Sequence, residues 1–228
     1  MKKRVFHTEL AYLLGLLTLA LGTALMERAD FGMSMVVAPA YLLYLKISRT
    51  LPWFSFGMAE YVFQAALLIA LGLAMRRFRK GYLFSFVTAV IYGLTLDGVM
   101  ALTALLPLWG VAGRCVDYVL GLALGSLGVA LLFHTYIAPE AYELFVKELA
   151  GKRGWRVDRV KTVYDCVSCL LGVALSFAFF GFGHFEGVKL GTILCALVNG
   201  WLIGRISAAL ERVFDFRDGL RLRPMFER

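Results

Sequence analysis

The sequence predicts an all-α polytopic membrane protein in which six transmembrane helices form two inverted three-helix repeats, each with a short amphipathic or re-entrant helix. Three observations predict this fold. The 228 residues are 60% hydrophobic and 18% charged, whereas soluble domains are about 45–50% apolar and about 25% charged. Six apolar runs are long enough to cross a bilayer. The two halves of the chain also share short motifs in the same order.

The six predicted spans are the apolar runs at 8–27, 56–75, 81–107, 115–135, 162–182 and 188–208. The first run needs a separate argument, because Lys2, Lys3 and Arg4 precede it as in a signal peptide. It is longer than the apolar region of such a peptide, which has about 7–15 residues. The charged segment 27–30 that follows is a poor cleavage site. We therefore expect this run to be the first span.

Two shorter segments are predicted not to cross. Residues 34–50 are apolar but interrupted by Pro39, which predicts a re-entrant helix or one that lies on the outer face. In residues 138–153, Pro139 stands where a first helical turn tolerates it. Apolar side chains then recur at helical spacing; they are Tyr142, Phe145, Val146 and Leu149. This second pattern predicts a cytoplasmic amphipathic helix on the surface.

The basic residues predict the orientation. If 34–50 does not cross, 19 of the 24 Lys and Arg residues fall on one side, in the N-terminus, 76–80, 136–161 and the C-terminal tail. If that segment crossed, the basic turn 76–80 would change sides and the bias would largely vanish. The positive-inside rule therefore selects six spans. It predicts a multi-pass protein of the bacterial inner membrane with both termini in the cytoplasm.

The predicted halves, residues 1–110 and 111–228, share motifs at an offset of about 100 to 106 residues. The matches pair 22–25 with 128–131, Ala38-Pro39 with Ala138-Pro139, and Asp97-Gly98 with Asn199-Gly200. Because each half has three spans, the two halves must be inverted relative to the membrane. Inverted repeats are typical of secondary transporters, although they also occur in proteins that transport nothing.

Polar residues in the middle of predicted spans are the candidates for a substrate or ion-binding site. Asp97 lies in the third span, with Thr95 and Tyr92 nearby, and Asn199 lies at the matching place of the second half. A charge at mid-bilayer costs at least about 2.5–3.5 kcal/mol, so such residues are functional candidates. We predict that they form a site at the repeat interface. The alternative is an Asp–Asn hydrogen bond that only holds the halves together.

Four further polar residues are gate candidates. Glu60 and Gln64 lie four residues apart near the outer end of the second span, where they could line an entrance or face water at a helix end. Asp165 and Arg205 lie near the cytoplasmic ends of the last two spans. They could form a structural ion pair or a gate that opens when the pair breaks.

The sequence predicts no enzyme, no cofactor, no metal site and no nucleic-acid partner. Cys166 and Cys169 lie within an apolar helix, where thiols pack as small hydrophobic groups. His184 and Glu186 are too few for a metal site, and no Ser-His-Asp order, phosphate-binding loop or HExxH motif is present. No basic stripe with interleaved aromatic residues indicates nucleic-acid binding.

Glycines at helical spacing predict close helix contacts. Gly121, Gly125 and Gly128 give the fourth span a face of small residues, and Gly200 and Gly204 do so in the last span. Close approach of helices within the chain is sufficient to explain both faces. Homodimerisation through one of them is the alternative.

With these motifs, the chain resembles the bacterial YczE/YyaS/YitT family of integral membrane proteins. The resemblance rests on Gly22-x-Ala-Leu, on the segment 28–34 (RADFGMS), and on the stretch from Gly191-Thr192 to Asn199-Gly200. The family usually continues with Ser-Pro and an acidic residue, whereas Met35 follows Ser34 here. The tail is too short for the soluble C-terminal domain of YitT-type members. The resemblance implies a polytopic inner-membrane protein of undefined activity.

Two functions remain open at the level of the sequence. The first is a small-solute secondary transporter, or a substrate-capturing membrane subunit, with a midplane site at the repeat interface. The second is a non-conducting scaffold or regulator that binds partner proteins through its basic cytoplasmic face. The expected partners are the lipid bilayer, an unknown small solute, and either a second copy or a cytoplasmic protein.

Overall fold

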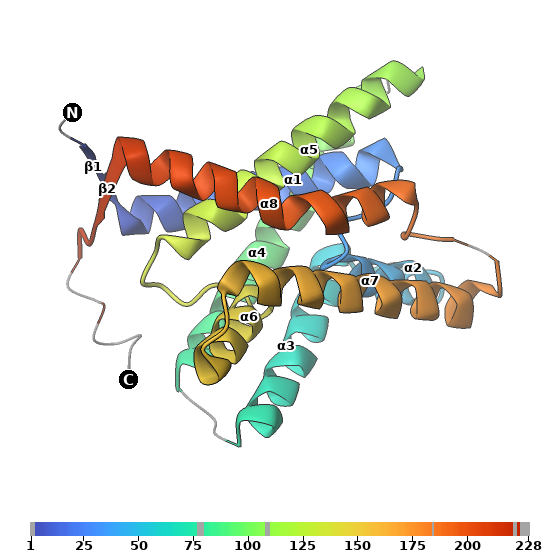
Figure 1. The fold of residues 1–228 in the computed structure, drawn as a ribbon. Coiled ribbons are helices and arrows are strands. Elements are labelled where there is room, and N and C mark those ends of the chain that lie inside the picture. The colour runs from blue at the N-terminus through green and yellow to red at the C-terminus, as the bar shows by residue number, and fades with distance from the viewer. Residues whose placement is uncertain (1–2, 77–79, 108–109, 184, 221–222, 224–228) are drawn as a thin grey trace.

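The computed structural model describes residues 3–76, 80–107, 110–183, 185–220 and 223 (Figure 1). These residues form eight helices and two short strands: β1 Arg4–His7, α1 Thr8–Ala29, α2 Ala38–Ile47, α3 Phe56–Met75, α4 Lys80–Thr103, α5 Gly110–Phe133, α6 Ala141–Arg153, α7 Val157–Phe180, α8 Leu190–Val213 and β2 Phe214–Arg217. Six of the helices are long and apolar enough to cross a membrane. The predicted all-α polytopic membrane fold is therefore confirmed.

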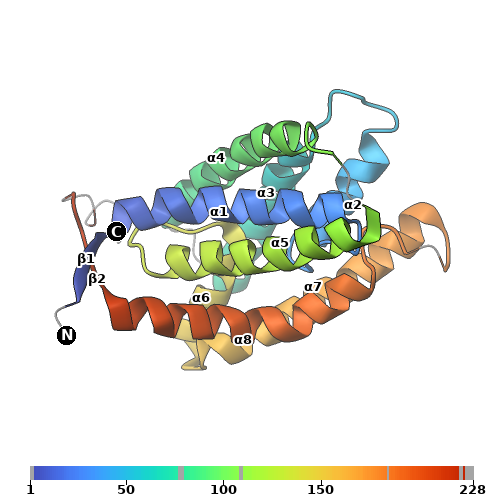
Figure 2. The same cartoon turned by 90° about the horizontal axis from the view of Figure 1, so that it is seen from above.

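The order of the helices is the same in both halves of the chain. A long helix, a short helix and two long helices occur as α1 to α4 and again as α5 to α8. The contacts follow the same order, because α1 packs on α4 as α5 packs on α8, while α2 contacts α3 and α7 as α6 contacts α7 and α3. In the centre α1 and α5 run antiparallel against each other (Figure 2).

Glycines allow α1 and α5 to approach closely. A Cβ atom at Gly22 would come within 2.7 Å of the Gly121 carbonyl oxygen, and one at Gly128 within 2.7 Å of the Gly15 carbonyl oxygen. The two contacts are related by the offset of 106 residues that aligns 22–25 with 128–131. Gly121 and Gly128 of α5 are therefore occupied within the chain, whereas homodimerisation stays a prediction. A Cβ at Gly204 would meet open space, so dimerisation through α8 stays a prediction.

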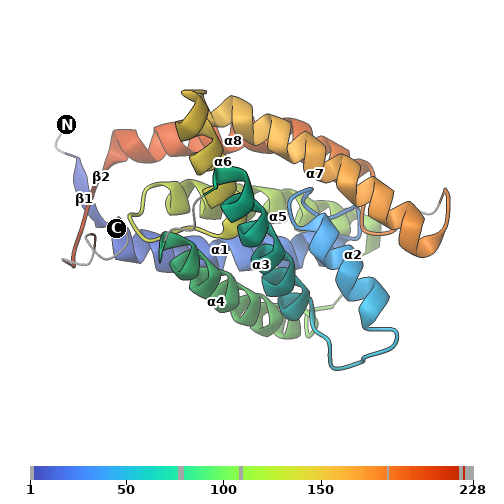
Figure 3. The same ribbon diagram turned by 90° about the horizontal axis from the view of Figure 1, so that it is seen from below.

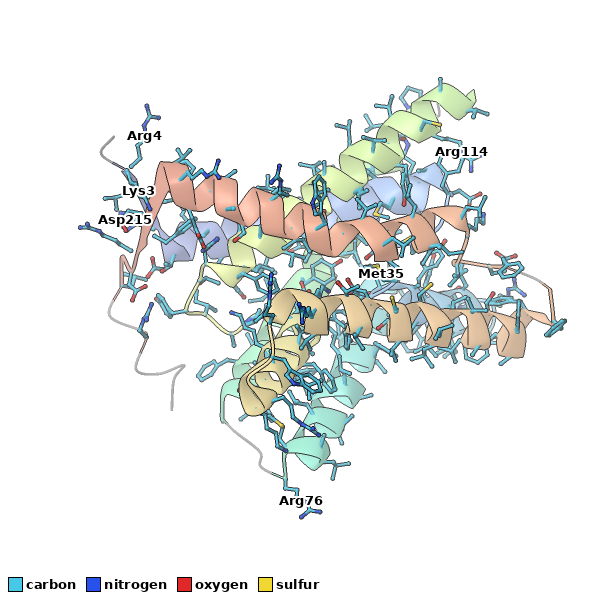
Figure 4. All side chains as sticks on the ribbon, viewed as in Figure 1. Lys3, Arg4, Met35, Arg76, Arg114 and Asp215 are labelled. Atoms are coloured by element: carbon cyan, nitrogen blue, oxygen red, sulfur yellow. The ribbon has the colours of Figure 1, made fainter. Side chains whose placement is uncertain are left out.

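The two chain ends meet at one end of the bundle. Strands β1 and β2 pair in parallel, with Arg4 opposite Phe214 and His7 opposite Arg217. Figure 4 shows Arg4 and Asp215 at this end, which we call the terminal end, and Arg114 at the other, which we call the distal end. Pairing of the two strands places the start of α1 and the end of α8 on the same side, as an even number of spans requires.

The short helices differ in how deeply they are buried. Helix α2 lies beside α7, and α6 lies beside α3 (Figure 3). The prediction that 138–153 is a surface helix is wrong for its first turn, because Ala141, Tyr142 and Glu143 are at most 3% exposed. Polar partners inside the bundle outweigh the amphipathic pattern of this segment. Tyr142 is therefore not available on the surface.

Candidate functional site

A cavity of about 40 Å³ lies where the two halves of the chain meet. Its walls come from both halves, and none of the side chains that line it is exposed. A volume of this size can hold a few water molecules, since one water needs about 10–15 Å³ on this measure. The polar part of the wall consists of Thr23, Ser34, Tyr92, Ser126, Glu140, Tyr142, Glu143, Lys161 and Asn199.

Two irregular linkers reach this cavity, one from each half. The linker between α1 and α2 contributes Ser34 and the two valines that precede α2. Met35 in this linker, which Figure 4 labels, is fully buried. The linker between α5 and α6 contributes Glu140. Irregular backbone at membrane depth is tolerated where it is buried in protein or lines a cavity.

Each linker is held by the last helix of the opposite half. The Met33 amide donates a hydrogen bond to the Gly187 carbonyl at 3.0 Å, and the Gly191 amide at the start of α8 donates to the Phe31 carbonyl at 2.9 Å. In the second half, the Ser85 hydroxyl of α4 donates to the Pro139 carbonyl at 2.6 Å. The cavity is thus bounded by two linkers, one hydrogen-bonded to α8 and the loop before it and the other to α4.

Four acidic side chains form a buried carboxylate cluster beside the cavity: Glu60, Glu140, Glu143 and Asp165. Each is at most 3% exposed. Glu140 and Glu143 line the cavity. The Tyr142 hydroxyl donates a hydrogen bond to Glu60 Oε2 at 2.9 Å. This cluster draws on α3 in the first half of the chain and on two helices of the second half, α6 at its start and α7.

Gln64 joins two of these carboxylates. Its Nε2 donates to Glu140 Oε2 at 3.0 Å and to Glu60 Oε2 at 3.3 Å. Its Oε1 accepts a hydrogen bond from the Ala141 amide at 3.0 Å, so the amide is fixed in one orientation. Gln64 therefore holds the first turn of α6 against α3.

Lys161 is a buried cation that faces the carboxylate cluster. Its Nζ lies 3.0 Å from Asp165 Oδ1 and 3.7 Å from Glu143 Oε1, and the side chain is 3% exposed. One oxygen each of Glu60, Glu140 and Glu143 is buried without a hydrogen-bond partner. Burial and the neighbouring carboxylates of Glu143 and Glu60 raise the pKa of Glu140 well above 4.5. The cluster thus holds more acidic groups than one lysine can neutralise, and it favours the uptake of protons or of a cation.

Two of the predicted site residues line the cavity. Asn199 Oδ1 accepts a hydrogen bond from the Ser126 hydroxyl at 2.8 Å. The Tyr92 hydroxyl pairs with the Thr23 hydroxyl at 2.9 Å. Asn199 and Tyr92 are at most 7% exposed. These two residues therefore add to the cavity wall neutral polar groups that already have partners.

Asp97 and Thr95 lie outside this cavity, so the predicted pairing of Asp97 with Asn199 is wrong. Asp97 accepts hydrogen bonds from the Gly57 amide at 2.8 Å and from the Ser55 hydroxyl at 2.6 Å. These groups belong to the start of α3, where free amides attract a carboxylate. Thr95 donates to the Ile91 carbonyl of its own helix at 2.7 Å.

The role of Asp97 as a cap leads to a stability prediction. We expect Asp97→Ala to lower the free energy of unfolding by about 1–2 kcal/mol, because the first turn of α3 loses its capping carboxylate. Thr95→Ala is the matched control, since its hydroxyl bonds only within its own helix. Thermal unfolding of the purified protein measures both. Equal melting temperatures for the two variants would contradict the capping role.

The gate candidates also differ from their predicted positions and partners. The predicted pair of Asp165 with Arg205 is wrong, because Asp165 pairs with Lys161 one turn earlier on the same helix. Arg205 is exposed, and its guanidinium lies 5.6 Å from the Trp201 ring centre. The reading that puts Glu60 and Gln64 at a helix end in water is also wrong, since both are completely buried.

Sequence reasoning missed Glu140, Glu143 and Lys161. The amphipathic pattern of 138–153 assigns both glutamates to a face in water. Lys161 is counted only as one of the basic residues of the cytoplasmic segment 136–161. One signal was present, because Lys161 and Asp165 are four residues apart at the start of an apolar run. Within the described residues, no group of three or more His, Cys, Asp or Glu side chains could hold a metal ion.

Ion pairs connect three helices at the distal end. Asp30, which follows α1, accepts from Arg114 of α5 at 3.1 Å and pairs with Lys189 at the start of α8. Arg28 Nε lies 3.3 Å from Asp117 Oδ2. Beside these pairs is a pocket of about 480 Å³, which Glu27, Asp30 and Tyr41 help to line.

A comparison with family profiles matches residues 6–208 to DUF6198, described as a family of unknown function. The chain belongs to the DUF6198 family. The matched residues of this DUF6198 protein include the whole carboxylate cluster and every residue that lines the cavity. The curated proteins and the solved structures give no match to the chain. The resemblance to the YczE/YyaS/YitT family stays a prediction.

Proposed function

We propose that the chain is a small-solute secondary transporter that binds a small cation in the central cavity and exchanges it for protons on the buried carboxylate cluster. The observation that carries this proposal is the excess of acidic groups at the cavity. Glu140 and Glu143 line it, whereas Lys161 is a buried cation that faces them. Intramembrane acidic residues mark ion pathways and proton relays.

The arrangement of the two halves supports alternating access. Each helix contact within one half recurs in the other, and the α1–α5 contact lies between them. If the halves are inverted repeats, exchanging their conformations opens the cavity first to one side and then to the other. The distal ion pairs around Asp30 and the β1–β2 pair at the terminal end would then be the contacts that break in turn.

The orientation follows from the basic residues. With the terminal end in the cytoplasm of a bacterial cell, the positive-inside rule is satisfied. The distal pocket, which Glu27, Arg28 and Asp30 help to line, then faces outward. A cation that passes the distal ion pairs would reach the cavity near Ser34.

Proton exchange in vesicles tests the proposal. The purified protein is reconstituted into liposomes that contain a pH-sensitive dye, and alkali ions and tetramethylammonium, which has no neutral form that crosses the bilayer, are added outside one at a time. We expect one of these cations to drive proton release from the vesicles. Glu140→Gln should abolish this flux, because the amide keeps the hydrogen bond with Gln64 but cannot carry a proton.

Asp97→Asn is the matched control, since it neutralises a carboxylate of the same bundle outside the cavity. We expect this variant to retain the flux. The proposal is overturned if no cation moves protons, or if Glu140→Gln transports as well as the unmodified protein. Loss of flux in Asp97→Asn with normal flux in Glu140→Gln would instead indicate that the cation binds at Asp97 in the third span.

A further inference from the structure

A second pocket lies on the outside of the bundle, in a groove between α6 and α7. The groove has a volume of about 530 Å³. Its walls are apolar, with Phe145 and Leu149 from α6 facing Val163 and Val167 from α7. It shares no lining residue with the central cavity. The groove is therefore a separate pocket from the central cavity.

The α7 side of this groove faces lipid. Val163 is 65% exposed and Val167 is 58% exposed, and both lie within the candidate span Arg159–Phe180. Leu170, one turn further on, is 70% exposed. A groove at this depth is surrounded by hydrocarbon, so an acyl chain fills it better than water does.

The mouth of the groove is basic. Arg156 and Arg159 line it, are exposed, and lie where the span begins. The segment 152–159 contains four basic residues and one acidic residue. Trp155 also lines the groove and is 55% exposed, as expected for an indole at the membrane–water interface. Positive charge at the mouth and an apolar floor match a phosphate head group and its acyl chain.

We infer that the α6–α7 groove binds an anionic phospholipid, with one acyl chain between Phe145 and Val163 and the phosphate beside Arg156 and Arg159. Basic pockets between membrane helices are known to bind anionic head groups. Planar guanidinium groups suit phosphate oxygens because they can donate two hydrogen bonds at once. A zwitterionic lipid offers the same chain but no net negative charge, so it should bind less well.

Quenching of Trp155 by brominated lipid tests the inference. The full chain carries Trp155 as its single tryptophan, with the other three replaced by phenylalanine. It is reconstituted into vesicles of phosphatidylcholine and phosphatidylglycerol at 80:20, in which bromine is attached to an equal amount of either lipid. We expect brominated phosphatidylglycerol to quench at least about twofold more strongly than brominated phosphatidylcholine, because each arginine favours the anionic head group.

Replacement of both arginines, Arg156→Gln with Arg159→Gln, should make the two quenchers equivalent. Arg205→Gln is the matched control, since Arg205 is an exposed arginine of α8 outside the groove. If the double variant fails to fold, 1 M salt added to the parent protein should reduce the preference instead. Equal quenching by both lipids in the parent protein, no quenching by either, or a preference that survives in the double variant would overturn the inference.

Discussion

Lys161→Met is expected to destabilise the folded protein by about 3–5 kcal/mol, the usual cost of removing one partner from a buried ion pair. The lysine is 3% exposed, and its Nζ lies 3.0 Å from Asp165 and 3.7 Å from Glu143. Methionine keeps the length and apolar stem of the side chain. The loss therefore reports the missing charge and not a cavity. The melting temperature of the purified protein measures it.

The destabilisation by Lys161→Met should depend on pH. The nearby ammonium group of Lys161 lowers the pKa of Glu140, which burial holds above 4.5, so its removal raises this pKa further. The folded state then binds protons that the unfolded state releases above about pH 4.5, and stability falls as the pH rises from there. We expect the variant to be closest to the parent protein near pH 5 and to lose stability towards pH 8.

A second substitution separates charge from packing. Asp165→Asn in the Lys161→Met background removes one of the two carboxylates that face the lost cation, and it should recover part of the lost stability. Gly98→Ala provides the control for an unrelated change, because a Cβ at this position meets open space. A pH-independent loss in Lys161→Met without rescue by Asp165→Asn would show that Lys161 does not neutralise the cluster.

The sequence was sufficient to predict the spans and the order of the helices. Long apolar runs and the distribution of basic residues are properties of local composition, so they predicted six spans and the short segments before α3 and α7. The helix starts at Thr8, Phe56 and Lys80 lie within one residue of the predicted ones. This agreement reflects the bilayer, which sets the length of a span without reference to its neighbours.

The candidate site was harder to predict because it depends on which helix faces meet. Asp97 lies in the middle of a predicted span, but its carboxylate accepts a hydrogen bond from the Gly57 amide at the start of α3. Glu140 and Glu143 look like residues in water, but the first turn of α6 turns inward and places them at the cavity. Only the contacts between α3, α6 and α7 reveal that these two glutamates share a site with Glu60 and Asp165. Residue spacing along one helix contains no information on such contacts.

Gly22→Leu is expected to prevent the two halves from packing together. A Cβ added at Gly22 would lie 2.5 Å from the Gly125 amide nitrogen and 2.7 Å from the Gly121 carbonyl oxygen. These are backbone atoms, so they cannot move aside as a flexible side chain could. Even Gly22→Ala should cost about 1–3 kcal/mol, as overpacking usually does, although alanine is the better helix former.

The comparison that tests this prediction is Gly22→Leu against Gly98→Leu, with melting temperature and yield of monodisperse protein as the measurements. Gly98 is an exposed glycine in a membrane-spanning helix, so leucine there adds only apolar surface towards lipid. Gly128→Leu should behave like Gly22→Leu, because its Cβ would lie 2.7 Å from the Gly15 carbonyl oxygen in the matching contact. Similar melting for Gly22→Leu and Gly98→Leu would mean that α1 and α5 are not in backbone contact. A strong effect of Gly22→Leu alone would mean that the two matching contacts are not equivalent, and the support that they give to alternating access would be lost.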